Sequence, residues 1–337
     1  MNLNNYEKLS HLIDKLRSMA SNKEFYNPQL TRSKIHCLVD DNLSIHALRC
    51  GKNSLEDNPT MQTVEYLFLS QESQETQRSL QWQPLVPSLF HPAFPILALR
   101  ENQIFGVVVG LLKNDQDNEC YSRYYAHCWS ITNDFSFLDT YPQALNTALK
   151  MAISKEGRLL LVSTPWFPSV AINLSRPLIL ASYQNKEFSI LANPLLGTNI
   201  AGSFPSSIAI YITNKNEVHL IYDGYYQSSQ DNGLHLWHLK LDISGKVLAA
   251  EDLGVSPKFP VFSEILTAPD GSMYLLIVHF DEMTRKTLEH KLIKIVGEDI
   301  ETSKTEYYFI DHWLQLHSVW FDNNQSYYYG PDKILVS

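Results

Sequence analysis

The sequence predicts an all-β protein built from six similar units and preceded by one helix. Three observations lead to this prediction. Beyond residue 30, apolar runs rich in β-branched and aromatic residues alternate with Asn, Asp, Gly and Pro. Pairs of such runs around a polar turn occur six times, at intervals of 53 to 60 residues, which indicates a repeat architecture. The chain is 44% hydrophobic and 19% charged, so there is ample apolar material for a core.

The first element is a helix near the N-terminus. Apolar residues recur at helical spacing from Tyr6 to Ala20, and charged residues occupy the other faces. We expect an amphipathic helix of about five turns within residues 1–22, followed by one repeat domain over residues 23–337. The expected role of the helix is to pack against that domain. Recruitment of a partner or a lipid surface is the alternative.

The six hairpins come next. Their turn markers are Asn42, Asn102, Gly157, Asn216, Gly271 and Asn324. A third apolar run follows each hairpin, and a fourth, aromatic-containing run follows in the first five units. The run EYYFIDHW at 306–313 is assigned as the fourth strand of the fifth unit, and residues 317–330 as the hairpin of the sixth. Four antiparallel strands per unit predict the blades of a β-propeller.

The two ends of the chain are expected to meet in the last blade. The sixth unit reaches Ser337 after its third run and so lacks a fourth strand. The segment KEFYNPQL at 23–30 resembles the other fourth strands in composition and position. We therefore expect this N-terminal segment to supply the missing strand and to close a six-bladed ring, leaving no gap between the first and last blades.

The fourth unit, residues 204–248, carries the most recognisable pattern. It has a Pro-Ser-Ser-Ile-Ala strand, a polar turn, a His-containing strand ending in Tyr-Asp, and an apolar third strand. This unit resembles the sialidase-like propeller repeats, which are related to the bacterial neuraminidase repeat. As an architecture the resemblance covers residues 23–337, and it implies the propeller fold while saying little about chemistry.

A sialidase mechanism would need an arginine cluster, a tyrosine nucleophile with a glutamate beside it, and an acidic aspartate. The residue types that this resemblance implies are present as Arg32, Arg123, Arg176, Tyr225 or Tyr226, Glu264, and Asp223 or Asp281. Their order differs from the catalytic pattern of the family. The expectation is therefore a broader hydrolase or lyase, in which Glu264, His279 or His317 transfers a proton.

The site is expected on the propeller rim that carries the loops between second and third strands and between units. Glu264 and His317 stand at the entry of the innermost strands of the last two units and should lie closest to the axis. The candidate catalytic residues are Glu264, His317, His279, Asp223 and Tyr225. The candidate ligand-binding residues are Arg32, His91, Trp166, Arg176, Tyr226, Asp281, His312 and Trp313, with Arg123, Lys258 and Asp311 also on this rim. Rings that stack on a sugar and charged groups that orient it suit a polar organic ligand.

Two functions follow from this site. The first is a binding module that recognises a polar organic ligand or a protein partner through its loop-rich rim. The alternative is a hydrolase or lyase acting on a carbohydrate-like or other polar organic substrate by general acid/base chemistry. With 27 Lys+Arg against 36 Asp+Glu, the net charge is −9, so nucleic acid is not an expected partner.

The remaining expectations concern compartment, metals and cofactors. The longest strongly apolar run, 105–112, is too short to span a bilayer, and the charged N-terminus does not read as a secretory signal, so a cytoplasmic location is expected, with non-classical secretion left open. Four cysteines without a C-x-x-C pair indicate reduced, buried thiols. His235 and His238 should lie on opposite faces of one strand. No cofactor or metal is expected, although convergence of His279, His312 and His317 on a transition metal is kept as a minor alternative.

Overall fold

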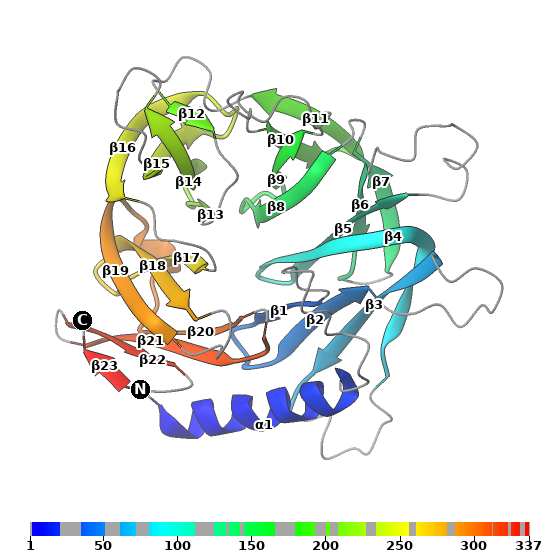
Figure 1. Cartoon of the computed structure of the whole chain (residues 1–337), viewed down its shortest axis with the longest axis horizontal. Coiled ribbons are helices and arrows are strands. Elements are labelled where there is room, and N and C mark those ends of the chain that lie inside the picture. Colours follow the sequence, from blue (N-terminus) through cyan, green and yellow to red (C-terminus); the bar gives the residue numbers. More distant parts are fainter. Residues whose placement is uncertain are drawn as a thin grey trace. The chain divides into compact units, whose positions relative to one another are not determined.

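The computed structural model describes most of the chain (Figure 1). The described residues are 2–20, 35–50, 61–71, 81–111, 125–132, 135–141, 145–165, 179–192, 200–202, 208–226, 234–255, 261–281, 287–311, 313–322, 325–330 and 334–336. They form one long helix, one 3₁₀ turn and small antiparallel sheets, which confirms the all-β prediction. The proposed closing strand at 23–30 lies outside the described residues. The six-bladed ring and its closure stay predictions.

The chain divides into two compact units. Unit 1 comprises Met1–Ala148 with Tyr308–Ser318. It holds helix α1 (Leu3–Ala20) and the strands β1 (Ile35–Val39), β2 (Ile45–Cys50), β3 (Met61–Leu69), β4 (Gln83–Arg100), β5 (Gln103–Leu111), β6 (Tyr125–Ser130) and β7 (Ser136–Thr140). These strands form one sheet in chain order, β1 to β7. The 18-residue β4 pairs with β3 through its first half and with β5 through its second half, so two four-stranded arrays share it. They match the first two predicted units.

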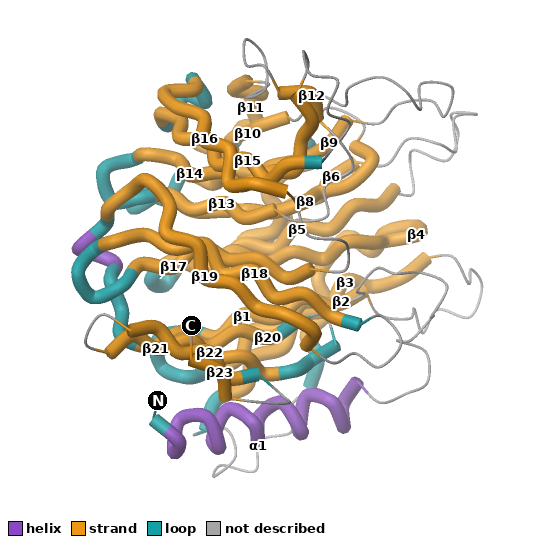
Figure 2. Tube along the Cα trace, turned by 60° about the vertical axis from the view of Figure 1, so that its left-hand side comes forward, coloured by secondary structure: helices purple, strands orange, loops and turns teal. Residues whose placement is uncertain are grey.

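Unit 2 comprises Leu149–Tyr307 with Val319–Ser337. One of its sheets has the order β11-β10-β9-β8, the next has β12-β14-β15-β16 with β13 paired to β14, and the third has β17-β18-β19. Figure 2 shows the strands of the third sheet side by side. The bounds are β8 Leu145–Ile153, β9 Leu159–Pro165, β10 Ile179–Gln184, β11 Glu187–Ala192, β12 Ile200–Gly202, β13 Ile208–Ile212, β14 Glu217–Tyr226, β15 His235–Asp242, β16 Val247–Val255, β17 Val261–Thr267, β18 Ser272–Phe280, β19 Thr287–Glu298 and the 3₁₀ turn η2 Ile300–Thr302.

The last sheet corrects the assignment of the sixth unit. Its order is β20-β21-β22-β23, with bounds Glu306–Ile310, Leu316–Asp322, Gln325–Tyr329 and Ile334–Val336. The run 306–310 is therefore the first strand of this sheet and not the fourth strand of the preceding one. The sheet has four strands of its own, so the reason for expecting the segment 23–30 to supply a missing fourth strand no longer holds. The predicted marker Asn324 falls between its second and third strands, outside the described residues, and the hydrogen bond from the Asp311 N–H to the Gln315 carbonyl oxygen closes its first hairpin.

A shared turn geometry explains how the repeat is encoded. In five first hairpins the backbone N–H of residue i donates to the carbonyl oxygen of residue i+4, and residue i+3 has a positive φ. The i+3 residues are Leu43, Gly157, Asn216, Gly271 and Leu314, with φ between 60° and 85°. Three of the predicted markers occupy this position. In the first and last hairpins the i+3 residue is leucine, although the positive φ favours glycine or asparagine. Because leucine is not a turn signal, the last turn could not be recognised from the sequence.

Hydrophobic faces stack the sheets in chain order within each unit. In unit 1, Leu48 and Tyr66 of the first array pack with Leu97 and Trp129 of the second. In unit 2, β9 and β10 pack against β13–β15, and the other face of that sheet packs against β17–β19. Both faces of the middle sheet are therefore covered, which accounts for its nearly continuous apolar strands.

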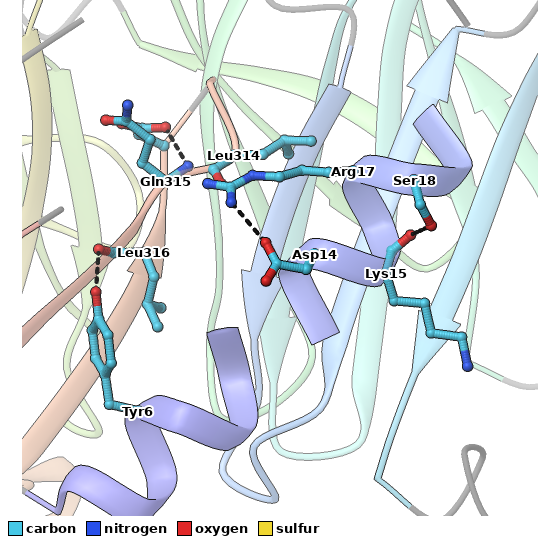
Figure 3. A network of polar contacts seen from close by, with 9 residues as sticks. Tyr6, Asp14, Lys15, Arg17, Ser18, Leu314, Gln315 and Leu316 are labelled. Carbon is cyan, nitrogen blue, oxygen red and sulfur yellow. Dashed lines mark hydrogen bonds and ion pairs between the residues drawn. The ribbon is translucent and has the colours of Figure 1, made fainter. Parts of the chain in front are cut away.

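Helix α1 packs on unit 1 as predicted. Leu9, Leu12, Ile13 and Leu16 are buried against β1–β3 and the 310–316 segment. Two side chains also reach carbonyl oxygens of that segment: the Tyr6 hydroxyl donates to Leu316 at 3.4 Å and the Arg17 guanidinium to Leu314 at 2.7 Å (Figure 3). The apolar face of α1 is thus occupied, and the recruitment alternative loses its support.

The cysteine prediction holds where it can be compared. Cys37, Cys50 and Cys128 are buried free thiols, and Cys120 lies outside the described residues. Burial raises the pKa of the Cys37 and Cys128 thiols well above their usual range. These thiols are therefore unreactive core residues. No helix in the described part of the chain is long and apolar enough to cross a membrane.

Candidate functional site

The candidate site lies where the first strands of the three sheets of unit 2 meet. The Ser263 hydroxyl on β17 donates to the carbonyl oxygen of Ile208 on β13 at 2.7 Å. Lys150 Nζ on β8 donates to Glu264 Oε1 on β17 at 2.5 Å. Figure 1 shows β13 between β8 and β17. The ion pair therefore joins two sheets that are not consecutive in the chain, and three first strands gather at one place.

Lys150 and Glu264 occupy equivalent positions in their hairpins. Each lies four residues before the residue that opens the turn, which is Ser154 in one hairpin and Ala268 in the other. The intervening strand has the small Ala209 at this position, four residues before Thr213. The repeat thus places Lys150 and Glu264 at the same position along their strands, and the small Ala209 occupies this position on the strand between them.

The pair is half-buried, with side-chain exposures of 21% for Lys150 and 26% for Glu264. An ammonium and a carboxylate at this separation attract each other more strongly than an exposed pair, because less water screens them. The carboxylate accepts hydrogen bonds from hydroxyl groups and the ammonium donates them. The two groups together suit a ligand rich in hydroxyls.

Several candidates lie at the end of the sheets that the sequence analysis assigned to them. Asp223 is near the end of β14, His279 is near the end of β18, and Asp281 directly follows β18. Antiparallel pairing places His279 opposite Val261, at the start of β17. Asp223 is fully buried, whereas His279 and Asp281 are partly exposed. The start of β17 and the ends of the second strands therefore share one end of their sheets.

The placement of His317 and its neighbours is a correction. Asp311 and Trp313 lie in the tight β20–β21 hairpin turn, and His317 follows on β21, the second strand. His317 is completely buried, and its Nε2 lies 3.0 Å from Asp311 Oδ2. The other Asp311 oxygen accepts the backbone N–H groups of Trp313 and Gln315. This arrangement holds a turn together and does not present His317 at the entry of a first strand.

The same turn motif occurs in the first hairpin. Asp40 Oδ1 accepts the N–H groups of Asn42 and Ser44, and its Oδ2 lies 3.2 Å from His46 Nε2. The spacing Asp-x₂-Leu-x₂-His is identical in the two hairpins. Asp311 and His317 are therefore structural residues of a repeated turn.

Nine candidates lie outside the described residues or have only their backbone described. Arg32, Arg123, Trp166, Arg176, Lys258 and His312 lie outside the described residues. His91, Tyr225 and Tyr226 belong to strands, and only their backbone is described. Their roles stay predictions.

Lys150 is the site residue that the sequence analysis missed. The sequence did contain a signal for it. Lys150 is a charged residue in the mostly apolar run 148–153, and it lies the same number of residues before its turn as Glu264 does in its own hairpin. His235 pairs with Asp252 at 2.9 Å and His238 with His219, so the two histidines do not share a partner. Among the described residues no group of three His, Cys, Asp or Glu side chains could hold a metal ion.

Neither a protein-family model nor a curated protein matches this sequence. Solved structures with which it aligns include an α-L-arabinofuranosidase of Fusarium graminearum bound to an iminosugar inhibitor, with TM-score 0.48, 10% identity and 93% of each chain covered. An α-L-arabinanase of Penicillium chrysogenum complexed with arabinobiose gives TM-score 0.46, 8% identity and 90% coverage of each chain. An endo-arabinase of Bacteroides thetaiotaomicron gives 0.42 and 9%, covering 81% of this chain and 96% of that one. At these values the likeness identifies neither a family nor a substrate for this chain.

Proposed function

We propose that this chain is a β-propeller enzyme that acts on a carbohydrate-like or other polar organic substrate, with Glu264 as the group that transfers a proton. The Lys150–Glu264 pair on the gathered first strands carries the proposal. Face-to-face stacking of small sheets in chain order and the gathering of first strands in unit 2 support the propeller. The arabinanases and the arabinofuranosidase named above accord with this substrate class.

The chemistry follows from the two groups of the pair. A carboxylate within hydrogen-bond reach of a substrate can take a proton from a hydroxyl, a water molecule or a carbon acid, as a hydrolase or a lyase requires. Lys150 holds Glu264 in one orientation and adds a donor for a substrate oxygen. A hydrolase of the two-carboxylate type would need a second carboxylate near Glu264; Asp223 is fully buried, and Asp281 lies five residues beyond Leu276, the residue that pairs with Glu264.

The test is a thermal-shift screen of the wild-type protein against sugars and oligosaccharides, followed by turnover assays on each compound that binds. A ligand at 100 times its Kd stabilises the native state by about 2.7 kcal/mol, which raises Tm. We expect a hit whose Tm shift is lost in Glu264→Gln and Lys150→Met. The control is Glu301→Gln, which breaks the exposed Lys155–Glu301 pair at 3.2 Å. It should keep the shift.

At substrate concentrations high enough to restore binding, loss of turnover in Glu264→Gln would support the proton-transfer role directly. Turnover unchanged in Glu264→Gln would contradict it. No Tm shift with any compound of the panel would contradict a carbohydrate-like ligand.

A binding module without chemistry is the second candidate. The observation in its favour is that Lys150 and Glu264 already satisfy each other, as charged groups in a recognition surface do. Binding without product formation from any ligand of the panel would establish this function in place of the enzyme.

A further inference from the structure

Two histidines form a buried pair on adjacent strands of unit 2. His219 lies on β14 and His238 on β15, with 2.9 Å between His219 Nδ1 and His238 Nε2. Their ring planes lie within 13° of each other, with centroids 5.2 Å apart, so the nearly parallel rings meet through these two nitrogen atoms. His219 is completely buried and His238 is 2% exposed. Neither residue takes part in the proposed site.

The pair lies at the junction between the β12–β16 sheet and the β17–β19 sheet. Ile221 and Leu236, two positions away on the same strands, belong to the core between these sheets. A Cβ atom added to Gly297 on β19 would lie 2.5 Å from His219 Cε1 and 2.5 Å from the sulfur of Met273 on β18. The second sheet therefore closes directly over the His219 ring.

One tautomer of each histidine satisfies the contacts. Glu251 Oε2 lies 3.3 Å from His238 Nδ1 and accepts a hydrogen bond from the Nδ1–H group. His238 Nε2 is then an acceptor, and His219 Nδ1–H donates to it. His219 Nε2 is left as a lone pair, and it has no hydrogen-bond partner in the described part of the chain. Both rings are neutral in this arrangement.

A further proton has no good place in the pair. On His219 it would occupy the unpartnered Nε2, and on His238 it would force the His219 proton from Nδ1 to that same Nε2. Burial lowers the pKa of His219 from 6.5 to about 3, with His238 and Lys240 adding to the effect. Burial also lowers the pKa of His238, against the opposing effect of Glu251.

The other charged groups near the pair do not offset the effect of burial on the pKa of His219. Lys240 on β15 is paired with Glu217 on β14 at 2.9 Å. Asp299, beyond the end of β19, favours a charged His219 but accepts the Tyr211 hydroxyl and the Asn214 N–H. Neither carboxylate hydrogen-bonds His219 in the described structure.

We propose that the His219–His238 pair is an acid-sensitive latch between these two sheets, closed when both rings are neutral and opened by proton uptake. The sign follows from linkage. In the opened state His219 has its ordinary pKa of 6.5, whereas in the closed state its pKa is about 3. The opened state therefore binds a proton at a higher pH than the closed state does. The latch is therefore fully closed above about pH 6.5 and weakens as pH falls toward 3.

The test is hydrogen exchange of β14, β18 and β19 amides in the full chain between pH 7 and pH 4.5, corrected for the intrinsic exchange rate. With one histidine shifted from 6.5 to about 3, the opening equilibrium constant should rise about 100-fold over this range. His219→Gln keeps a polar side chain that does not titrate, and it should lose most of this pH dependence. His11→Gln, at an exposed histidine of α1, should keep it.

Three results would overturn the proposal. They are a flat pH profile in the wild type, an unchanged profile in His219→Gln, and an equal loss in His11→Gln. A purely structural role would raise exchange in His219→Gln equally at both pH values. If His219→Gln does not fold, an NMR titration of the imidazole nitrogens in the wild-type protein replaces it. Protonation of either ring near the ordinary histidine pKa, with the two sheets still closed, would contradict the latch.

Discussion

Replacing Asp311 with alanine is expected to lower the free energy of unfolding by about 3–5 kcal/mol, because it removes one partner of a fully buried polar network. The carboxylate holds the N–H groups of Trp313 and Gln315 at 2.8 and 2.9 Å and His317 Nε2 at 3.0 Å. Both Asp311 and His317 have 0% side-chain exposure, so water cannot replace the lost contacts. Urea denaturation followed by tryptophan fluorescence measures the effect.

The first hairpin provides a matched control. Asp40 makes the same contacts, but its side chain is 15% exposed. Asp40→Ala should therefore cost less, about 1–3 kcal/mol. Asp242 lies in an exposed turn, where its carboxylate accepts the backbone N–H groups of Ser244 and Lys246. Asp242→Ala should therefore lower the free energy of unfolding by less than Asp40→Ala. Equal losses at Asp311 and Asp40 would show that burial does not determine the strength of this turn.

Truncating Leu12 to alanine is expected to destabilise the protein by about 2–5 kcal/mol, the range for a fully buried leucine. Leu12 has 0% exposure and packs with Ile45, Leu67 and Leu316 in the core of unit 1. The loss combines the transfer of the side chain to water with the cavity left between α1 and the sheet. The measurement is the midpoint and m-value of a urea transition.

The control for Leu12 is Lys8→Ala on the exposed face of the same helix, which should change stability by less than about 0.5 kcal/mol. An unchanged midpoint in Leu12→Ala would mean that α1 does not pack on unit 1 in solution. Recruitment of a partner through its apolar face would then regain support.

The local elements were predictable because their signals are local. The helix followed from apolar spacing between Tyr6 and Ala20, and Gly157, Asn216 and Gly271 marked the turns at which φ is positive. The strands that these turns join are neighbours in their sheets, as expected. Backbone sterics of the turn residues and side-chain periodicity suffice for such assignments.

The last sheet was not predictable in the same way. Its first turn has Leu314 in the left-handed position, only 43 residues after Gly271, and the aromatic strand 306–310 resembles either a first or a fourth strand. The hydrogen bonds of a sheet decide between these alternatives, and they form between residues distant in the chain. His317 was consequently predicted at the start of a first strand, although it lies on a second strand and stabilises a buried turn through its contact with Asp311.

For the candidate site, local pattern was enough to predict the residue types and the end of the hairpin on which Glu264, His279 and Asp281 lie, because it specifies strand direction and turn position. Which groups meet depends on the packing of the sheets. This packing paired Glu264 with Lys150, 114 positions away in the chain, and it buried His317. The physical reason is that a contact between sheets depends on how their faces stack, and no local periodicity encodes that stacking.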